Sequence, residues 1–130
     1  MKFLHPPNWA RPRGYANGVA AKGTMVFLSG IVGWNAQGQF TSSDFTAQVR
    51  QALANIVEIL REANAKPEHI ARMTWYVLNK NEYLAAAKAV GAVYREMIGS
   101  HYPAMSVVEV SGLIEAAARV EIEVTAVVPD

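Results

Sequence analysis

The sequence predicts an α+β fold, formed by a single domain of residues 1–130 in which two helices pack on the same face of a sheet. Two observations predict this class. Apolar residues recur at three-and-four spacing in two long segments, which indicates amphipathic helices, and they alternate or run together in shorter segments, which indicates strands. The 130 residues, of which 52% are hydrophobic, suffice for one core, and no linker or internal repeat divides them.

Residues 1–14 are predicted to form an extended N-terminal arm, because three of the six prolines lie there and proline blocks regular hydrogen bonding. Residues 15–22 and 24–29 are predicted to be strands joined by a tight turn at Gly23, which would make a β-hairpin. Three glycines then interrupt the pattern before a short strand that is expected over residues 39–41.

Two apolar stripes predict the helices. The second helix is expected from about Glu82 to Ile98, with Gly99 as its C-terminal stop. Gly91 lies in its middle, where glycine costs roughly 1 kcal/mol relative to alanine, so another backbone or a ligand is expected to approach closely there. The first helix carries its stripe at Phe45, Val49, Leu53, Ile56 and Leu60, with Ser42 or Ser43 as its cap and Asn64 and Pro67 at its end.

Three further strands are expected in the second half of the chain. Residues 70–78 are apolar on both faces, which is typical of a central strand. In residues 119–128 the even positions are all apolar, while Glu121 and Glu123 lie opposite, and in residues 104–111 both faces are partly apolar. A sheet face that carries apolar and acidic groups together predicts a symmetric homo-oligomer, with small-molecule ligand sites between the subunits.

Composition narrows the classes of function. Twelve Lys and Arg against eleven Asp and Glu give a net charge of +1 without a basic tract, so no nucleic-acid partner is expected. There is no cysteine, no apolar leader and no apolar run of membrane-spanning length, which favours a soluble, cytoplasmic protein with no membrane partner. No phosphate loop or GxGxxG motif occurs and the three histidines are far apart in the sequence, so we expect no cofactor and no metal.

Five segments, taken in order, resemble the RidA/YjgF family of enamine and imine deaminases. The resemblance covers nearly the whole chain. It implies a chorismate-mutase-like single domain, a mixed sheet with two helices packed on one face, and a homotrimer with three ligand clefts at its subunit interfaces. The segments are GYANG at 14–18, VFLSG at 26–30, QALANI at 51–56, YPAMSVVEV at 102–110 and VEIEVTAV at 120–127.

The resemblance also implies site residues. The family tyrosine after the arm corresponds to Tyr15, the serine before the glycine to Ser29, and the late-strand glutamate that positions the attacking water to Glu121. In archetypal members an arginine pairs with the substrate carboxylate, but the corresponding residue here is Met105. Three more polar positions of the family are occupied here by Val107, Ile31 and Gly91.

Two main hypotheses follow from these residues. In the first, the protein hydrolyses an enamine or imine with an apolar or aromatic portion, which Met105, Val107, Ile31 and Trp34 would contact. Glu121 would act as general base toward water and Tyr15 would hold the nitrogen end. Arg11 or Arg13 of the arm could meet an anionic group. In the second, the cleft binds a small molecule without converting it, and the protein is an interaction module.

Ordinary structural roles can also account for these residues. A glutamate on the polar face of a strand is more often solvated than catalytic, and Met105 is most simply a core or interface residue. A third hypothesis, the binding of single-stranded RNA, depends only on Trp9, Arg11 and Arg13 in the arm. It predicts salt-sensitive binding of a fluorescent single-stranded RNA at low ionic strength.

Overall fold

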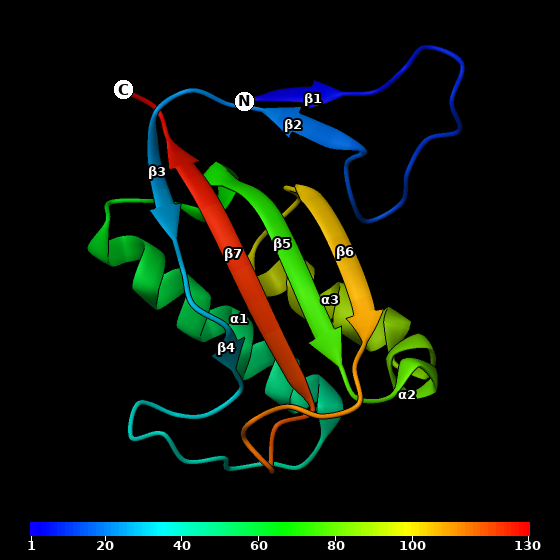
Figure 1. The fold of residues 1–130 in the computed structure, drawn as a ribbon, viewed down its shortest axis with the longest axis vertical. Helices are drawn as coiled ribbons and strands as arrows, with labels where there is room; N and C mark the ends of the chain where they lie inside the picture. The colour runs from blue at the N-terminus through cyan, green and yellow to red at the C-terminus, as the bar shows by residue number, and fades with distance from the viewer.

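The computed structural model describes residues 1–130 and shows an α+β domain built on a mixed sheet. The strand order is β3-β7-β5-β6, and β4 extends the β3 side by pairing with β7 (Figure 1). Strands β5 and β6 are parallel, whereas β3, β4 and β5 pair with β7 in antiparallel register. The bounds are β3 (Thr24–Phe27), β4 (Ile31–Val32), β5 (Ile70–Val77), β6 (Ala104–Glu109) and β7 (Val120–Val128).

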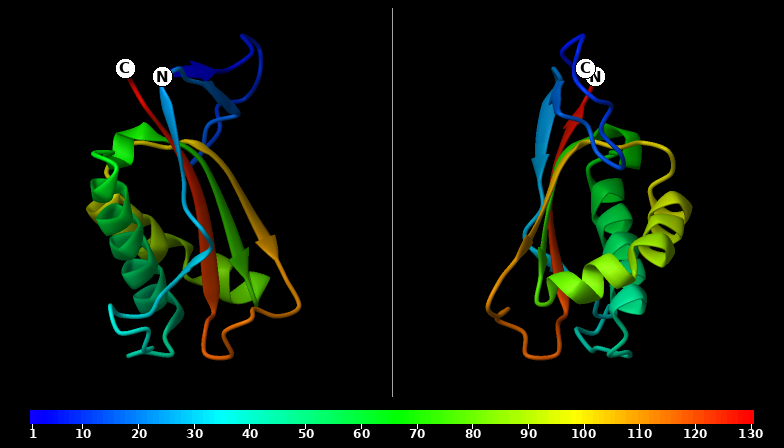
Figure 2. Two further views of the ribbon diagram at one scale, coloured as in Figure 1. Left: turned by 60° about the vertical axis from the view of Figure 1, so that its left-hand side comes forward. Right: turned by 90° about the vertical axis from the view of Figure 1, so that its right-hand side faces the viewer.

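The helices cover one face of this sheet and leave the other open (Figure 2). They are α1 (Phe45–Glu62), α2 (Lys80–Ala85) and α3 (Ala87–Met97), with a 3-10 turn at Pro67–His69. The core lies between α1, α3 and the sheet, and the even residues of β7 from Val120 to Ala126 are all buried in it, as their alternation predicts. None of the helices combines the length and the apolar content that crossing a membrane would require.

The expected second helix is in fact two helices, so the prediction of two helices was wrong. The chain turns at Ala86, whose φ and ψ are −91° and 3°, and α3 begins at the next residue. The ring of Tyr83 packs edge-on against Phe45 and Trp75, which holds α2 over the end of the sheet. Helix α3 instead packs along α1. Two packing partners in different directions explain the break.

The start of α1 also differs from expectation. Asp44 is the N-cap, and its side chain accepts a hydrogen bond from the backbone N–H of Ala47 at 2.9 Å. Ser42 supports this cap, because its Oγ accepts from the N–H of Asp44 at 3.0 Å. The predicted caps, Ser42 and Ser43, are therefore displaced by the residue that follows them.

The N-terminal hairpin was predicted with the wrong partner. Strand β2 (Gly18–Ala20) pairs with β1 (Lys2–Leu4) in a separate two-stranded sheet, and β3 pairs with β7. The predicted arm of residues 1–14 therefore contains a strand. Residues 39–41 form no strand, because Asn35 organises a turn there and accepts the N–H of Gln39 on its side-chain oxygen. Figure 1 shows the small sheet beyond the end of the main one, near the C-terminus.

Candidate functional site

Two residues of the predicted site, Ser29 and Glu121, come together at a bulge in the sheet. Strand β3 ends with Phe27 opposite Thr125, and β4 resumes with Ile31 opposite Ile122. The chain advances four positions on one side and three on the other, so the segment Ser29-Gly30 holds one extra residue. Such bulges redirect the chain and often lie beside functional sites.

The side chain of Glu121 lies directly against Gly30. A Cβ placed on Gly30 would stand 2.5 Å from Glu121 Oε2 and 2.6 Å from Cδ, which is closer than real Cβ contacts. Only glycine therefore lets the carboxylate occupy this position beside Ser29. None of the chain's ion pairs or side-chain hydrogen bonds involves the carboxylate of Glu121, which is half-buried. Its oxygens are free to accept hydrogen bonds.

Tyr76 adds a neutral donor to this region. It stands opposite Glu121 on β5, and its hydroxyl donates to Glu123 Oε1 at 3.2 Å. The negative charge of Glu123, then partial desolvation and this hydrogen bond, and last the charge of Glu121, raise the pKa of Tyr76 above its ordinary value. Sequence reasoning missed Tyr76 because strand 70–78 is apolar on both faces. The only signal in the sequence was that Tyr76 follows Trp75 in a strand, which places the two side chains on opposite faces.

The apolar members of the predicted site lie elsewhere. Met105 and Val107 stand opposite the buried residues Met73 and Trp75, so they face the helices and pack against the core at the β6 edge. Ile31 also packs against the core, but at the β4 edge, with β7 and β5 lying between the two edges. One chain therefore carries Glu121 on β7, facing the open side of the sheet, and Met105 and Val107 on β6, facing the helices.

Gly91 and Trp34 are separate from both groups. Gly91 is exposed on α3, and nothing in the chain lies within 4 Å of a Cβ placed there, so the expected close approach is not made within the chain. Trp34 lies in the loop after β4, where its ring packs on Phe40 with centroids 5.8 Å apart. Its carbonyl accepts a hydrogen bond from Asn55 Nδ2 at 2.8 Å. Asn55 thus ties this loop to α1.

Tyr15 lies close to the start of β6. The next residue, Ala16, forms a parallel bridge to Ala104 and donates its N–H to the carbonyl of Pro103 at 2.9 Å, which places the backbone of Tyr15 beside Pro103. Tyr15 also lines a cavity of about 980 Å³ at the end of the domain, together with Arg11. Arg13, the other arginine of the arm, is exposed and does not line it.

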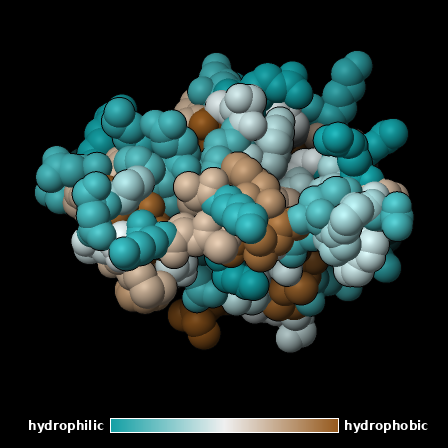
Figure 3. Space-filling model, turned by 90° about the horizontal axis from the view of Figure 1, so that it is seen from above, coloured by the Kyte–Doolittle hydropathy of each residue, from teal (hydrophilic) through white to brown (hydrophobic).

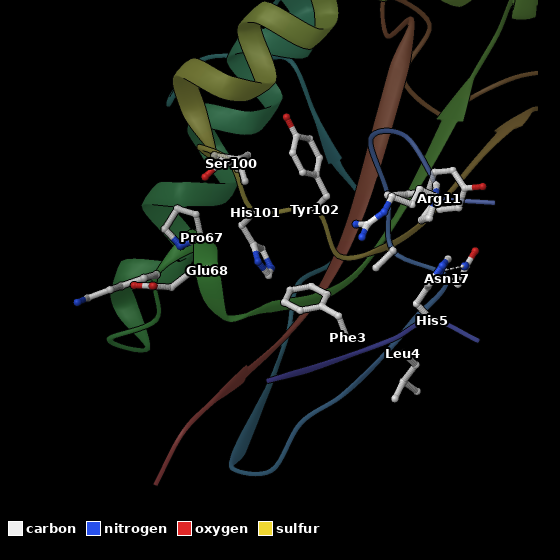
Figure 4. Close-up of a pocket in the computed structure, with 15 residues that line it drawn as sticks. Phe3, Leu4, His5, Arg11, Asn17, Pro67, Glu68, Ser100, His101 and Tyr102 are labelled. Atoms are coloured by element: carbon white, nitrogen blue, oxygen red, sulfur yellow. Dashed lines mark hydrogen bonds between the residues drawn. The ribbon is translucent and has the colours of Figure 1, made fainter. Parts of the chain in front are cut away.

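Two histidines that are distant in the sequence line this same cavity. His5 and His101 both line it, and Nδ1 of His5 lies 3.2 Å from Nδ2 of Asn17. Figure 4 shows His101 in the middle of the group, with Phe3 beside it. The sequence alone could not reveal that both histidines line one cavity, because this depends on the placement of β1 over the loop before β6.

Comparison with known proteins identifies the relatives of this chain. The family model described as Endoribonuclease L-PSP matches residues 9–128. A protein of Salmonella typhimurium named 2-iminobutanoate/2-iminopropanoate deaminase is 33% identical over 116 residues, which cover 87% of this chain and 86% of the relative.

Solved structures agree with this assignment. A Rid-family protein of unknown function from Yersinia pestis has a TM-score of 0.87 at 30% identity, covering 98% of each chain. A member of the YjgF/YER057c/UK114 family from Mycobacterium tuberculosis has a TM-score of 0.66 at 32% identity, covering 88% of this chain and 87% of its own. The chain therefore belongs to the RidA/YjgF family, which the matched family model describes as Endoribonuclease L-PSP.

Proposed function

We propose that the protein is a hydrolytic deaminase of a reactive enamine or imine that carries an apolar or aromatic portion. The observation that carries this proposal is the position of Glu121, whose unpaired carboxylate lies against Gly30 and beside Ser29. A carboxylate that packs against the backbone at Gly30 and is free of hydrogen bonds and cations is suited to act as general base toward water. The relatives named as imine deaminases support this reaction class.

The proposed reaction is the addition of water to a carbon–nitrogen double bond. Glu121 takes a proton from water while the oxygen forms its bond to the imine carbon, and it then passes this proton to the nitrogen, which gives a carbinolamine. Glu121 next takes the hydroxyl proton of the carbinolamine and delivers it to the nitrogen as the carbon–nitrogen bond breaks, which releases ammonia and leaves a carbonyl group. Ser29 and the hydroxyl of Tyr15 are the groups that we assign to orienting the substrate, with Tyr15 at the nitrogen end.

We propose that this site is completed between subunits of a homotrimer. Glu121 and Met105 lie on opposite faces of the sheet, two strands apart, so a neighbouring subunit must bring its Met105 to the Glu121 of the first. A head-to-tail contact closes into a ring when the rotation between subunits returns to the first one. The open face supports self-association as well, since Phe27 is 70% exposed and Met25 is 56% exposed on it.

The substrate class follows from the β6 edge. Met105 and Val107 present a thioether and an isopropyl group, which cannot pair with a carboxylate, and burying an unpaired anion is costly. They favour a substrate with an apolar or aromatic group at this end. Ile31 contributes a further apolar side chain from the β4 edge.

The test is ammonia release from freshly generated imines of acidic, small and aromatic amino acids. We expect the wild type to hydrolyse aromatic or large apolar imines and Glu121→Gln to lose this activity. Met105→Arg should shift the preference toward small imino acids, because it restores a bidentate partner for a carboxylate near the reacting carbon. Equal rates for the wild type and Glu121→Gln would refute the general-base assignment.

The alternative, a binding module without catalysis, has one structural observation in its favour. Met105 and Val107 pack against the core of their own chain, as ordinary structural residues do. If the wild type releases no ammonia from any imine and only Met105→Arg becomes active, the scaffold has kept the geometry but not the reaction. That result would favour the binding module.

A further inference from the structure

The cavity at the end of the domain has the size of a ligand site. Its volume is about 980 Å³, at the upper end of the range of roughly 300–1,000 Å³ that small-molecule pockets occupy. It lies between the two-stranded sheet β1–β2 and the loop that leads from α3 into β6 (Figure 4). Seen from this end, apolar surface occupies the middle and hydrophilic surface surrounds it (Figure 3).

One part of the wall is aromatic and held in place. Phe3 meets His101 edge-on, with centroids 5.8 Å apart and 61° between the planes, yet Phe3 is 52% exposed. Tyr102 is stacked on Tyr94 at 5.3 Å, which fixes its ring. His101 Nε2 lies 2.7 Å from the carbonyl of Ile70. Because a carbonyl can only accept, this nitrogen donates and Nδ1 is left without a protein partner.

The charged part of the wall is Arg11. The chain's three ion pairs use Arg50, Arg61 and Arg119, so Arg11 has no carboxylate partner. In Figure 4 its guanidinium turns toward the middle of the cavity. Glu68 is the one acid that lines the cavity. In Figure 4 it lies on the opposite side from Arg11, with His101 and Phe3 between them, and no ion pair joins Glu68 to Arg11.

A guanidinium that faces a cavity without a partner selects for an anion. Its planar fork matches the two oxygens of a carboxylate, and a single such group balances one negative charge better than the two of a phosphate monoester. Lys66 is the only other lysine or arginine of the lining. The exposed ring of Phe3 and the fixed ring of Tyr102 offer flat apolar surface beside the guanidinium, which suits a planar ring.

We propose that this cavity binds a small aromatic carboxylate, with Arg11 pairing the carboxylate and the rings of Phe3, His101 and Tyr102 contacting the aromatic group. This site goes beyond the proposed deamination, because it requires neither Glu121 nor hydrolysis. It also lies on one chain, whereas the proposed catalytic cleft needs two, and the two sites share Tyr15, which lines the cavity. Arg11 would give the protein a carboxylate anchor that Met105 cannot supply.

The test is calorimetric titration of the full chain with indole-3-acetate, a stable aromatic carboxylate that contains no imine. We expect saturable binding, and we expect indole-3-acetamide and acetate to bind about tenfold more weakly, since each lacks one of the two recognised groups. Arg11→Met should weaken indole-3-acetate about tenfold and abolish its advantage over the amide. Arg13→Met is the matched control, because Arg13 is exposed, as Arg11 is, but lies outside the lining; it should leave binding unchanged.

Two further variants and one inhibition measurement separate this proposal from the proposed reaction. Phe3→Leu should weaken indole-3-acetate but not acetate. Glu121→Gln should leave binding unchanged, so the cavity can prove correct while the proposed reaction fails, and the reverse. Competitive inhibition of aromatic imine hydrolysis by indole-3-acetate would identify the occupant as an imino acid, and unaltered hydrolysis would identify a separate effector. No saturable heat at millimolar ligand, or equal losses for Arg11→Met and Arg13→Met, would overturn the proposal.

Discussion

Glu121 on β7 lies over Gly30 in the bulge between β3 and β4, and the contact leaves no room for a side chain at position 30. Two segments about 90 residues apart in the sequence thereby place a carboxylate against the glycine that follows Ser29. The glycine acts here by its missing Cβ, since its φ is not in the left-handed region. The same contact offers a way to move the carboxylate without removing it.

Gly30→Ala should displace the carboxylate of Glu121 while the chain still folds, because the clashing atoms belong to the end of a flexible side chain. Displacement of a catalytic group by about 1 Å can reduce a rate on the order of 100-fold. Imine hydrolysis by Gly30→Ala should fall accordingly. Gly112→Ala is the control, because nothing lies within 4 Å of a Cβ there. Full activity of Gly30→Ala would show that the observed position of Glu121 is not the working one.

Phe27→Glu should dissociate the proposed trimer. Phe27 is 70% exposed on the open face, so a glutamate there costs the isolated chain little, but a subunit that covers this face would bury the new charge without a partner. Light scattering should show the mass fall from that of a trimer to that of a monomer. Ile114→Glu, at a residue 98% exposed between β6 and β7, should keep the wild-type mass. A wild type that is already monomeric would remove the interface cleft.

Gly91→Ala should stabilise the chain. Gly91 lies inside α3 with nothing within 4 Å of a new Cβ, and alanine is favoured over glycine in a helix by about 1 kcal/mol. Urea denaturation should give a higher free energy of unfolding by about 0.5–1 kcal/mol. A destabilised or dissociated variant would instead mean that another subunit packs against this glycine.

Tyr94 should make the protein sensitive to alkaline pH. Its hydroxyl donates to the carbonyl of His101 at 2.6 Å, and burial, with a smaller contribution from Tyr102, raises its pKa far above the ordinary value. The unfolded chain loses this proton near pH 10 and the folded chain keeps it. The stabilisation is therefore complete below pH 10 and declines as pH rises above it.

The slope of that decline is at most about 1.4 kcal/mol per pH unit. Unfolding by denaturant at pH 8 to 11 should show a smaller decline for Tyr94→Phe, which has no proton to lose. At pH 8 the variant should be less stable by about 1 kcal/mol, the net value of one hydrogen bond. Parallel pH profiles for the two proteins would contradict this account.

Local patterns predicted the parts of the fold that local forces decide. The stripe of α1 and the alternation of β7 were read correctly, because each depends on which residues face a core and not on which element supplies it. The α+β class followed from those elements and their order, whereas the mixed sheet and the family followed from the resemblance of five short segments. The break at Ala86 did not, because the contacts of Tyr83 with Phe45 and Trp75 lie outside its own segment.

Gly23 is required by a contact that no local sequence pattern could predict. It was read as the turn of a hairpin, but a Cβ there would stand 2.0 Å from the carbonyl oxygen of Val128, so the position needs glycine because β7 passes over it. The sequence by itself determined the residue types, the buried faces and the family. Only the tertiary structure decided that β2 pairs with β1, that Glu121 lies over Gly30 and that Arg11 lines a cavity with His101, because each depends on contacts between segments far apart in the chain.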